Sequence, residues 1–450
     1  SSLGYVGRYV MKFVRILGVL AVVAAIAAAA AYSWATRYDE IAAIQPVSPS
    51  SFDSNLVDRG EQLSALGDCD VCHTRPGGER LAGGLELPTP FGIIRTTNIT
   101  PDPDTGIGRW SEAAFLRAMH EGVDRGGNHL YPAFPYDHFT RVTPEDIGAI
   151  YAYLMSQPAV KYQPPQSELR FPFGFRPLLA GWKLLFLNRG VYETDPEQNE
   201  EWNRGAYLVL GLGHCGACHT PRNALGALKR NAHLAGGDAE DWDIPPLGGA
   251  SIAPIAWTTN SIANYLFDGW DKHHGIAAGP MTPVVNHLYD QPEDDVFAMA
   301  AYLTSFENSG ARGPDTEAVV ADAARLDWGS DVRPGGSDSP SDPALRRGEK
   351  LFFDQCVDCH KAVVSPSQPV SLALTFTMNA PTARNIVHII FDGIRPPVVA
   401  VQRSMPALAR TVSDEELIDL LAYARWRFTD GPPWSDLPET VAAARARGAN

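Results

Sequence analysis

All six cysteines of this 450-residue chain lie in three copies of one five-residue pattern. The copies are CDVCH at 69–73, CGACH at 215–219 and CVDCH at 356–360. Two thiols with this spacing can bond to the two vinyl groups of a haem, and the following imidazole can bind the iron. A redox dithiol does not need the histidine, and a zinc site needs its C-x-x-C pairs close together, whereas these lie about 140 residues apart. The pattern therefore predicts three covalent haem c groups. Their attachment and proximal residues are Cys69, Cys72 and His73, then Cys215, Cys218 and His219, then Cys356, Cys359 and His360.

The second axial ligand of each iron is expected in a loop beside proline. Met281, in AGPMTP, lies 21 residues before Tyr302, and Met405, in RSMPAL, lies 18 residues before Tyr423. Proline restrains such a loop and helps to aim the sulfur. We predict Met281 and Met405 as distal ligands, with a place in the core as the alternative for each. Met378 competes in the third repeat, but it lies too early by this count.

The first repeat has no methionine at the corresponding place. The same count reaches Phe134, 19 residues before Tyr153, and a phenylalanine cannot ligate iron. His138 follows in the same loop, YPAFPYDHF at 131–139, and we predict it as the sixth ligand. Because imidazole gives a lower haem potential than methionine, the first haem is expected to be the lowest of the three and the entry point for electrons. The open alternatives are His129, His120, Met119 and an iron without a sixth ligand.

Similar elements surround each motif. RGEQLSALGDCDVCHT starts at Arg59, RGAYLVLGLGHCGACHT at Arg204 and RGEKLFFDQCVDCHK at Arg347, and each opens as a helical pattern. EDIGAIYAYL at 145–154, DDVFAMAAYL at 294–303 and EELIDLLAYA at 415–424 are typical of amphipathic helices with an acidic first turn. A helix before and after each motif predicts a mostly α chain of three tandem class I cytochrome c domains.

An apolar segment precedes the repeats. Ile16 to Trp34 contains no charge and is about 28 Å long as a helix, close to the thickness of a bilayer core. Arg8, Lys12 and Arg15 precede it, which places the N-terminus in the cytoplasm. We expect a single anchor in the bacterial inner membrane with the haem domains in the periplasm. A cleaved signal peptide is the alternative.

Composition marks the remaining boundaries. The expected order is a membrane anchor at 1–39, a linker at 40–54, domain 1 at 55–165, an aromatic strap at 166–198, domain 2 at 199–310, a linker at 311–341, domain 3 at 342–432 and a polar tail at 433–450. The strap contains RFPFGFRPLLAGWKLLF, which is too short and interrupted to span a membrane. Packing between domains, a partner surface and a membrane face remain open for it. A net charge of −15 without a basic stripe argues against nucleic acid as a partner.

Several segments resemble one family over nearly the whole chain. They are TNITPDPDTGIGRWSEAAF, YPAFPYDHF, FRPLLAGWKLLF, WNRGAYLVLGLGHCGACHTPRNALG and HHGIAAGPM, beside the three haem motifs. They look like the membrane-anchored three-haem cytochrome c subunits of bacterial periplasmic dehydrogenases. In subunits that serve flavin- or quinone-cofactor alcohol and sugar dehydrogenases, the first loop usually has methionine where Phe134 stands. The form with Phe134 resembles the branch that partners xanthine-oxidase-type molybdenum hydroxylases of aldehydes, nicotinate or isoquinoline.

That resemblance implies a molybdenum-containing catalytic subunit, a [2Fe–2S] subunit, and ubiquinone or a terminal oxidase as acceptor. The chain has no cysteine left for an iron–sulfur cluster and no G-x-G-x-x-G fingerprint after a strand, so it is expected to carry electrons and not to oxidise an organic substrate itself. The same role beside a flavin or quinoprotein dehydrogenase is the first alternative. A free-standing haem peroxidase or sensor is the second.

Overall fold

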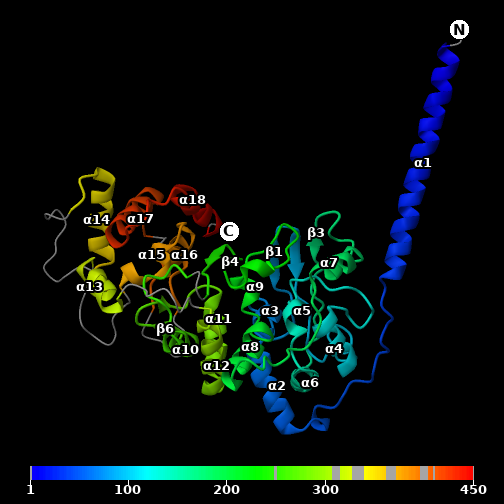
Figure 1. Ribbon diagram of the computed structural model, residues 1–450, viewed down its shortest axis with the longest axis horizontal. Helices are drawn as coiled ribbons and strands as arrows, with labels where there is room; N and C mark the ends of the chain where they lie inside the picture. The colour runs from blue at the N-terminus through cyan, green and yellow to red at the C-terminus, as the bar shows by residue number, and fades with distance from the viewer. Residues whose placement is uncertain are drawn as a thin grey trace.

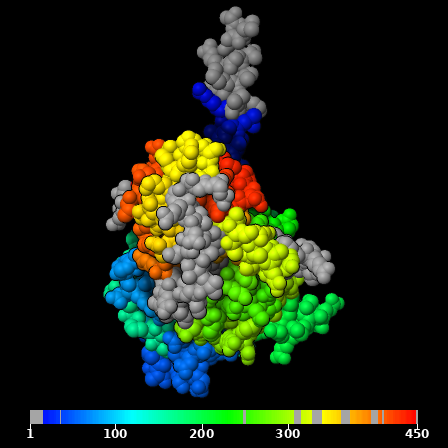
Figure 2. Space-filling model, turned by 90° about the vertical axis from the view of Figure 1, so that its left-hand side faces the viewer, coloured from blue at the N-terminus to red at the C-terminus, as the bar shows by residue number. Residues whose placement is uncertain are grey.

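The computed structural model describes residues 3–247, 251–306, 315–326, 339–360, 371–395, 404–408 and 411–448. The described chain is mostly helical, as predicted. One long helix, α1 (Leu3–Ala35), stands clear of a body built from the remaining elements (Figures 1 and 2). Residues 15–34 of α1 are long and apolar enough to cross a membrane, and none of them is buried against the body.

The elements of the body follow the three repeats. In the first repeat they are η1 (Pro49–Ser51), α2 (Ser54–Leu66), α3 (Cys69–His73), β1 (Glu86–Thr89), β2 (Gly92–Arg95), α4 (Glu112–Glu121), α5 (Tyr136–Phe139) and α6 (Pro144–Ser156). The strap holds β3 (Glu168–Leu169) and α7 (Leu178–Phe186). In the second repeat they are α8 (Glu200–Leu210), α9 (Gly216–His219), η2 (Arg230–Ala232), β4 (Gly237–Ala239), β5 (Trp242–Ile244), α10 (Thr259–Asp268), β6 (Trp270–Asp271), β7 (Gly275–Ile276), α11 (Met281–Tyr289) and α12 (Glu293–Thr304).

The third repeat follows α13 (Thr316–Leu326). Its elements are α14 (Pro343–Gln355), η3 (Leu372–Leu374), α15 (Phe376–Asn379), α16 (Arg384–Asp392), α17 (Asp414–Phe428) and α18 (Leu437–Gly448). The strands pair antiparallel in three small sheets, ordered β1-β2-β3, β4-β5 and β6-β7. In the first sheet Glu86 faces Arg95, and Gly92 faces Leu169 of the strap.

Side-chain caps start most of the helices that flank the haem motifs. The Asn199 side chain accepts from the backbone N–H of Trp202 at the start of α8, and Ser413 and Glu416 form a capping box at the start of α17. Asp53, Thr143 and Asp342 cap α2, α6 and α14 in the same way. Such caps satisfy amide groups that have no partner within the helix. Helices α6 and α17 begin within one residue of the predicted start, whereas α2, α8 and α14 begin four or five residues before the predicted Arg-Gly pairs, at their capping residues.

One helix crossing recurs in all three repeats. The first helix of each pair packs on the last, α2 on α6, α8 on α12 and α14 on α17. A Cβ added to Gly60 would lie 2.0 Å from the Ala149 carbonyl oxygen and 2.8 Å from the Tyr153 Cβ. Glycine is disfavoured inside a helix, so its presence here reflects the close approach of two backbones. Gly205 makes the same approach to Ala298 and Tyr302, and Gly348 to Asp419 and Tyr423.

An arginine before each of these glycines joins the two helices by charge. Arg204 donates to both carboxylate oxygens of Asp295, each at 2.7 Å. Arg347 donates to Asp419 at 2.6 Å. Arg59 binds Asp146 in the first repeat. The Arg-Gly dipeptide is therefore the sequence signal of the crossing: the glycine permits the approach and the arginine orients it.

The buried apolar side chains form two clusters. The first is continuous across the first and second repeats, and it joins residues such as Leu63 and Ile150 to Leu208 and Met299. The second belongs mainly to the third repeat and includes Phe352, Leu420 and Phe428. The first two repeats thus share one core, while the third has its own.

Two segments expected to be irregular contain helices. The part of the expected linker 311–341 that the structure describes includes α13, whose Ala323 is buried in the second cluster. The expected polar tail, 433–450, contains α18, which packs through Leu437, Val441 and Ala444. The apolar residues of α18 recur at three- and four-residue steps on one face, which is the pattern of an amphipathic helix. The polar composition of 433–450 as a whole does not reveal this pattern.

Candidate haem sites

The histidines of the first two motifs are held by backbone carbonyl groups. The Nδ1 of His73 lies 2.6 Å from the Thr97 carbonyl oxygen, and the Nδ1 of His219 lies 2.8 Å from that of Pro245. Burial lowers the pKa of both imidazoles, which favours the neutral form. An imidazole that donates from Nδ1 to a carbonyl presents an unprotonated Nε2, the state in which histidine binds a metal.

His360 of the third motif is also buried, and burial lowers its pKa. Its Nδ1 is buried without a hydrogen-bond partner among the residues that the structure describes. The chain that follows this histidine, 361–370, lies outside those residues.

None of the six motif cysteines forms a disulfide in the described chain. Burial in apolar surroundings raises the pKa of Cys69 to about 11 and those of Cys72, Cys215 and Cys356 to about 12. Apolar surroundings of this kind would suit a vinyl-bearing ring.

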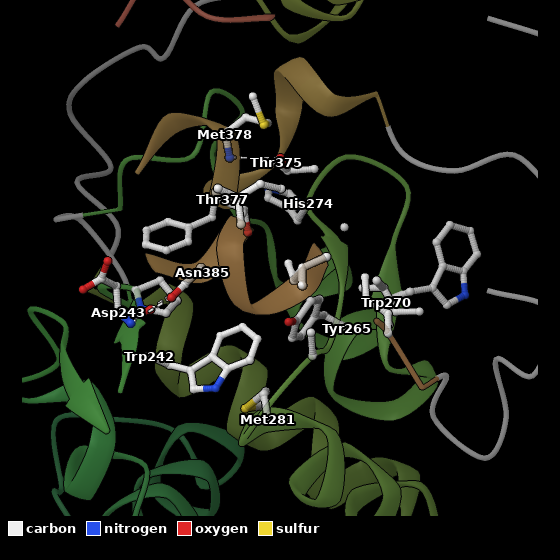
Figure 3. A pocket seen from close by; sticks show the side chains of 18 of the residues that line it. Trp242, Asp243, Tyr265, Trp270, His274, Met281, Thr375, Thr377, Met378 and Asn385 are labelled. Carbon is white, nitrogen blue, oxygen red and sulfur yellow. Dashed lines mark hydrogen bonds between the residues drawn. The ribbon is translucent and has the colours of Figure 1, made fainter. Parts of the chain in front are cut away.

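A cavity of about 800 Å³ lies between the second and third motifs (Figure 3). Its lining is mainly apolar and aromatic, with Trp242 and Tyr265 among the side chains drawn in Figure 3. It includes Cys215, Cys218, His219 and Met281 of the second repeat and Cys356, Cys359, His360 and Met405 of the third. Its apolar character and its donor set fit haem, with the ligands of two motifs in one lining. Leu66 also lines the cavity, but the first-repeat motif residues do not.

The predicted methionine ligands both line this cavity. Met281 is the first residue of α11 and follows Pro280, so a helix end and not a loop positions it. The backbone of Met405 exchanges two hydrogen bonds with Ile394, of 2.9 and 3.1 Å. Met378 lines the cavity as well and is buried, with its carbonyl oxygen bound by Arg425. Geometry thus leaves Met378 beside Met405 as a candidate in the third repeat.

The alternative candidates for the sixth ligand of the first haem are either hydrogen-bonded or buried in the core. His129 uses both ring nitrogens: Nε2 lies 2.9 Å from the Thr36 carbonyl oxygen and Nδ1 lies 3.1 Å from the Lys183 Nζ. The Nε2 of His120 lies 2.8 Å from the Val142 carbonyl oxygen. Met119 is buried in the first apolar cluster. Phe134 also packs against that cluster, 5.4 Å from Phe139 between ring centroids.

His138 has the arrangement expected of a metal-binding histidine. Its Nδ1 lies 3.1 Å from the Leu210 carbonyl oxygen, and its Nε2 is buried without a hydrogen-bond partner in the described chain. Burial lowers its pKa to about 4, so the ring is neutral. A buried polar atom without a partner is costly, and a ligand on Nε2 would remove that cost.

His138 also lies at the contact between the first two repeats. A Cβ on Gly216, inside the second motif, would stand 3.0 Å from its Cε1. A matching contact runs the other way: the Nδ1 of His287 in α11 lies 2.6 Å from Asp68, just before the first motif. The two motifs are therefore brought together by histidines of the opposite repeat. Sequence analysis missed His287 and the orienting carbonyl groups, although His138 and His287 both lie 15 residues before the repeat tyrosine.

The third repeat is joined to the second mainly by polar contacts. Asn385 of α16 accepts from the backbone N–H of Asp243 and donates to its carbonyl oxygen, both at 2.8 Å. The rings of His388 and Trp242 stack at 4.8 Å. Trp242, Asp243 and Asn385 all line the cavity (Figure 3), and their contacts hold β5 against α16.

Comparison with known proteins finds one matching family model and several relatives of this chain. A family model described as cytochrome c oxidase, cbb3-type, subunit III matches residues 343–423, which include the third motif. A nicotinate dehydrogenase subunit of Pseudomonas putida is 43% identical over 413 residues, covering 90% of this chain and 33% of that protein. This chain therefore spans about one third of that relative.

Two further relatives are of more similar length. The fructose dehydrogenase cytochrome subunit of Gluconobacter japonicus is 33% identical over 395 residues, which cover 85% of this chain and 81% of that protein. A diheme cytochrome c-type protein of Cereibacter sphaeroides is 40% identical over 253 residues, which cover 54% of this chain and 84% of that protein.

Proposed function

Because this chain belongs to the family of cytochrome c subunits of dehydrogenases, we propose that it carries electrons from a periplasmic dehydrogenase through three haem c groups. It is the cytochrome subunit and not the catalytic subunit of such a complex. Bound haem would supply a one-electron iron couple. The observation that carries the proposal is the threefold C-x-x-C-H motif, in which two of the histidines are oriented by carbonyl groups.

In this proposal each repeat is a cytochrome c domain. Its cysteines attach one haem, and His73, His219 and His360 bind the iron on the near side. Met281 and Met405 bind the far side in the second and third domains, which their place in the cavity lining supports. The recurring Gly–Tyr helix crossing supports the division into three domains. The shared core of the first two repeats supports a two-haem unit, of the kind that the diheme relative's name describes.

We assign the far side of the first iron to His138. Of the candidate histidines, it is the one with a buried ring nitrogen that lacks a partner in the described chain. The Leu210 carbonyl orients the other nitrogen, so the second repeat would help to hold a ligand of the first. A histidine pair there, beside histidine–methionine pairs elsewhere, would make the first haem the electron entry point.

The proposed partner is a molybdenum-containing aldehyde or N-heteroaromatic dehydrogenase with a [2Fe–2S] subunit. The 43% identity to the nicotinate dehydrogenase subunit supports this branch. The match to the fructose dehydrogenase cytochrome subunit keeps a flavin or quinoprotein sugar or alcohol dehydrogenase as the second candidate. The proposed acceptor is ubiquinone or a terminal oxidase, and α1 is the proposed inner-membrane anchor, with the haem domains in the periplasm.

Purification of the tagged full chain with its native partners tests the function. A haem assay under denaturing conditions should find three covalent haems per chain, and each Cys-to-Ala pair in one motif should remove one. Molybdenum and acid-labile sulfide in the copurified complex would support the molybdenum branch. Flavin or pyrroloquinoline quinone in their place would favour the second candidate, and a chain that binds no dehydrogenase would contradict the proposal.

A further inference from the structure

The strap between the first two repeats exposes a group of large apolar side chains. Phe171 is 95% exposed, Leu184 is 87% exposed and Leu185 is 67% exposed. Phe173, Phe175 and Leu178 are exposed beside them. A set of exposed apolar side chains of this size indicates a surface that a membrane or another molecule covers.

The strap packs against the end of α1. The Tyr32 hydroxyl in the last turns of α1 lies 3.0 Å from where a Cβ on Gly181 would stand, in the middle of α7. Arg189 donates to the hydroxyl of Tyr38 at 2.7 Å. Figure 1 shows α7 on the side of the body that faces the lower end of α1. The strap therefore lies beside the C-terminal end of the apolar segment of α1.

A buried lysine fixes this arrangement. Lys183 of α7 donates to the carbonyl oxygens of Glu121 and Gly122 at 2.7 and 2.6 Å. Its Nζ also lies 3.1 Å from His129, whose other nitrogen contacts the carbonyl group of Thr36 just after α1. One face of α7 is thus tied to the first repeat and to the end of α1, while the exposed Leu184 and Leu185 lie outside that contact.

The charge of the strap is opposite to that of the chain. Residues 170–189 contain Arg170, Arg176, Lys183 and Arg189 and no acidic residue, in a chain of net charge −15. Aromatic rings and cations beside apolar side chains are typical of the interface between a bilayer and water. Trp34, 81% exposed at the end of α1, belongs to the same belt. The exposed Arg170 and Arg176 match the anionic lipid headgroups of a membrane.

We propose that residues 170–187 lie on the membrane surface beside α1, with Phe171, Leu184 and Leu185 inserted among the lipids. The proposal rests on the proposed anchor role of α1. Helix α7 has nine residues and is far too short to span a bilayer, so it lies along the surface. Two attachments, α1 and the strap, would fix the orientation of the haem domains on the membrane. A single helix followed by an extended segment would leave that orientation free.

Photo-crosslinking from the assembled complex in cell membranes tests this. A diazirine amino acid replaces Leu184, or Phe171 in a second variant; both side chains are exposed, so the fold should tolerate the change. Val22 in α1 is the positive control. The matched negative control is Leu56, an exposed leucine of α2, the helix that Figure 1 draws at the lower edge of the body, away from α1. We expect lipid adducts at positions 184 and 171 comparable with those at 22 and severalfold above those at 56.

Each other outcome overturns the proposal in a distinct way. Lipid adducts at 22 without adducts at 184 and 171 would leave the anchor intact and remove the strap from the membrane. Adducts of 184 to a dehydrogenase subunit or to a second copy of this chain would identify a protein interface instead. An absence of lipid adducts at 22 would remove the anchor itself, and the strap proposal with it.

Discussion

The helix crossing in the third repeat gives a quantitative prediction. In Gly348→Ala the added Cβ would lie 2.0 Å from the Asp419 carbonyl oxygen and 2.7 Å from the Tyr423 Cβ. Ordinary contact begins at 3.4 Å, so α14 and α17 must separate by more than an ångström. Overpacking of this kind costs about 3 kcal/mol. Alanine favours a helix over glycine by up to about 1 kcal/mol, so the expected net loss in the free energy of unfolding is about 2 kcal/mol.

For a unit of this size a loss of about 2 kcal/mol lowers the unfolding midpoint by roughly 8–16 °C. Thermal unfolding of the haem-loaded protein, followed by Soret circular dichroism, measures it. Because the third repeat has its own core, Gly348→Ala should shift one transition, while Gly60→Ala should shift another that the first two repeats share.

Gly174→Ala is the matched control, since no atom lies within 4 Å of the added Cβ. Its midpoint should stay within about a degree of the parent protein, as surface changes usually do. If Gly348→Ala were as stable as this control, the crossing would not be tight. If Gly60→Ala and Gly348→Ala shifted one common transition, the division of the core into two clusters would be wrong.

Three further predictions concern titratable and ligand groups. His138→Met should convert a bis-histidine EPR signal into a histidine–methionine one with its near-infrared band, whereas His129→Gln, at a ring with both nitrogens engaged, should not; an unchanged spectrum in His138→Met would exclude His138 as the ligand. The hydrogen bond to Asp68 raises the pKa of His287, so its contribution to stability is present at acid pH and is lost as pH rises through the raised pKa. His287→Gln should therefore destabilise the protein at pH 6 and hardly at pH 9 in denaturant titrations, and an equal loss at both would contradict the ion pair. Burial lowers the pKa of Lys183 to about 7, so the unfolded chain binds the extra proton above that pH and stability should rise from pH 7 towards 10. In Lys183→Met that rise should be absent, and a rise that persists would show that another group causes it.

The chemistry of this chain could be read from local sequence. Cys69, Cys72 and His73 lie within five consecutive residues, and their spacing alone matches the two vinyl groups and the iron of a haem. The amphipathic helices around the motifs follow from the period of their apolar residues and from their caps. The apolar segment of α1 can be recognised from its own residues and its length, without reference to any other part of the chain.

Other features depend on residues far apart in sequence. The carbonyl groups of Thr97 and Leu210 that orient His73 and His138 leave no trace in side-chain type, because any residue supplies a carbonyl. From its composition, 433–450 is predicted to be a polar tail. In the structure Leu437 and Val441 are buried, because α18 packs against α16 and α17.

The sequence alone therefore predicted three sites of haem attachment, since covalent attachment needs only neighbouring residues. Tertiary structure decided which repeats share a core, which motifs line one cavity and which histidine nitrogen stays without a partner in the described chain. It also placed the exposed side chains of the strap beside the end of α1. Each of these depends on the close approach of distant segments, and hydrophobic packing and hydrogen bonds fix that approach only in the folded chain.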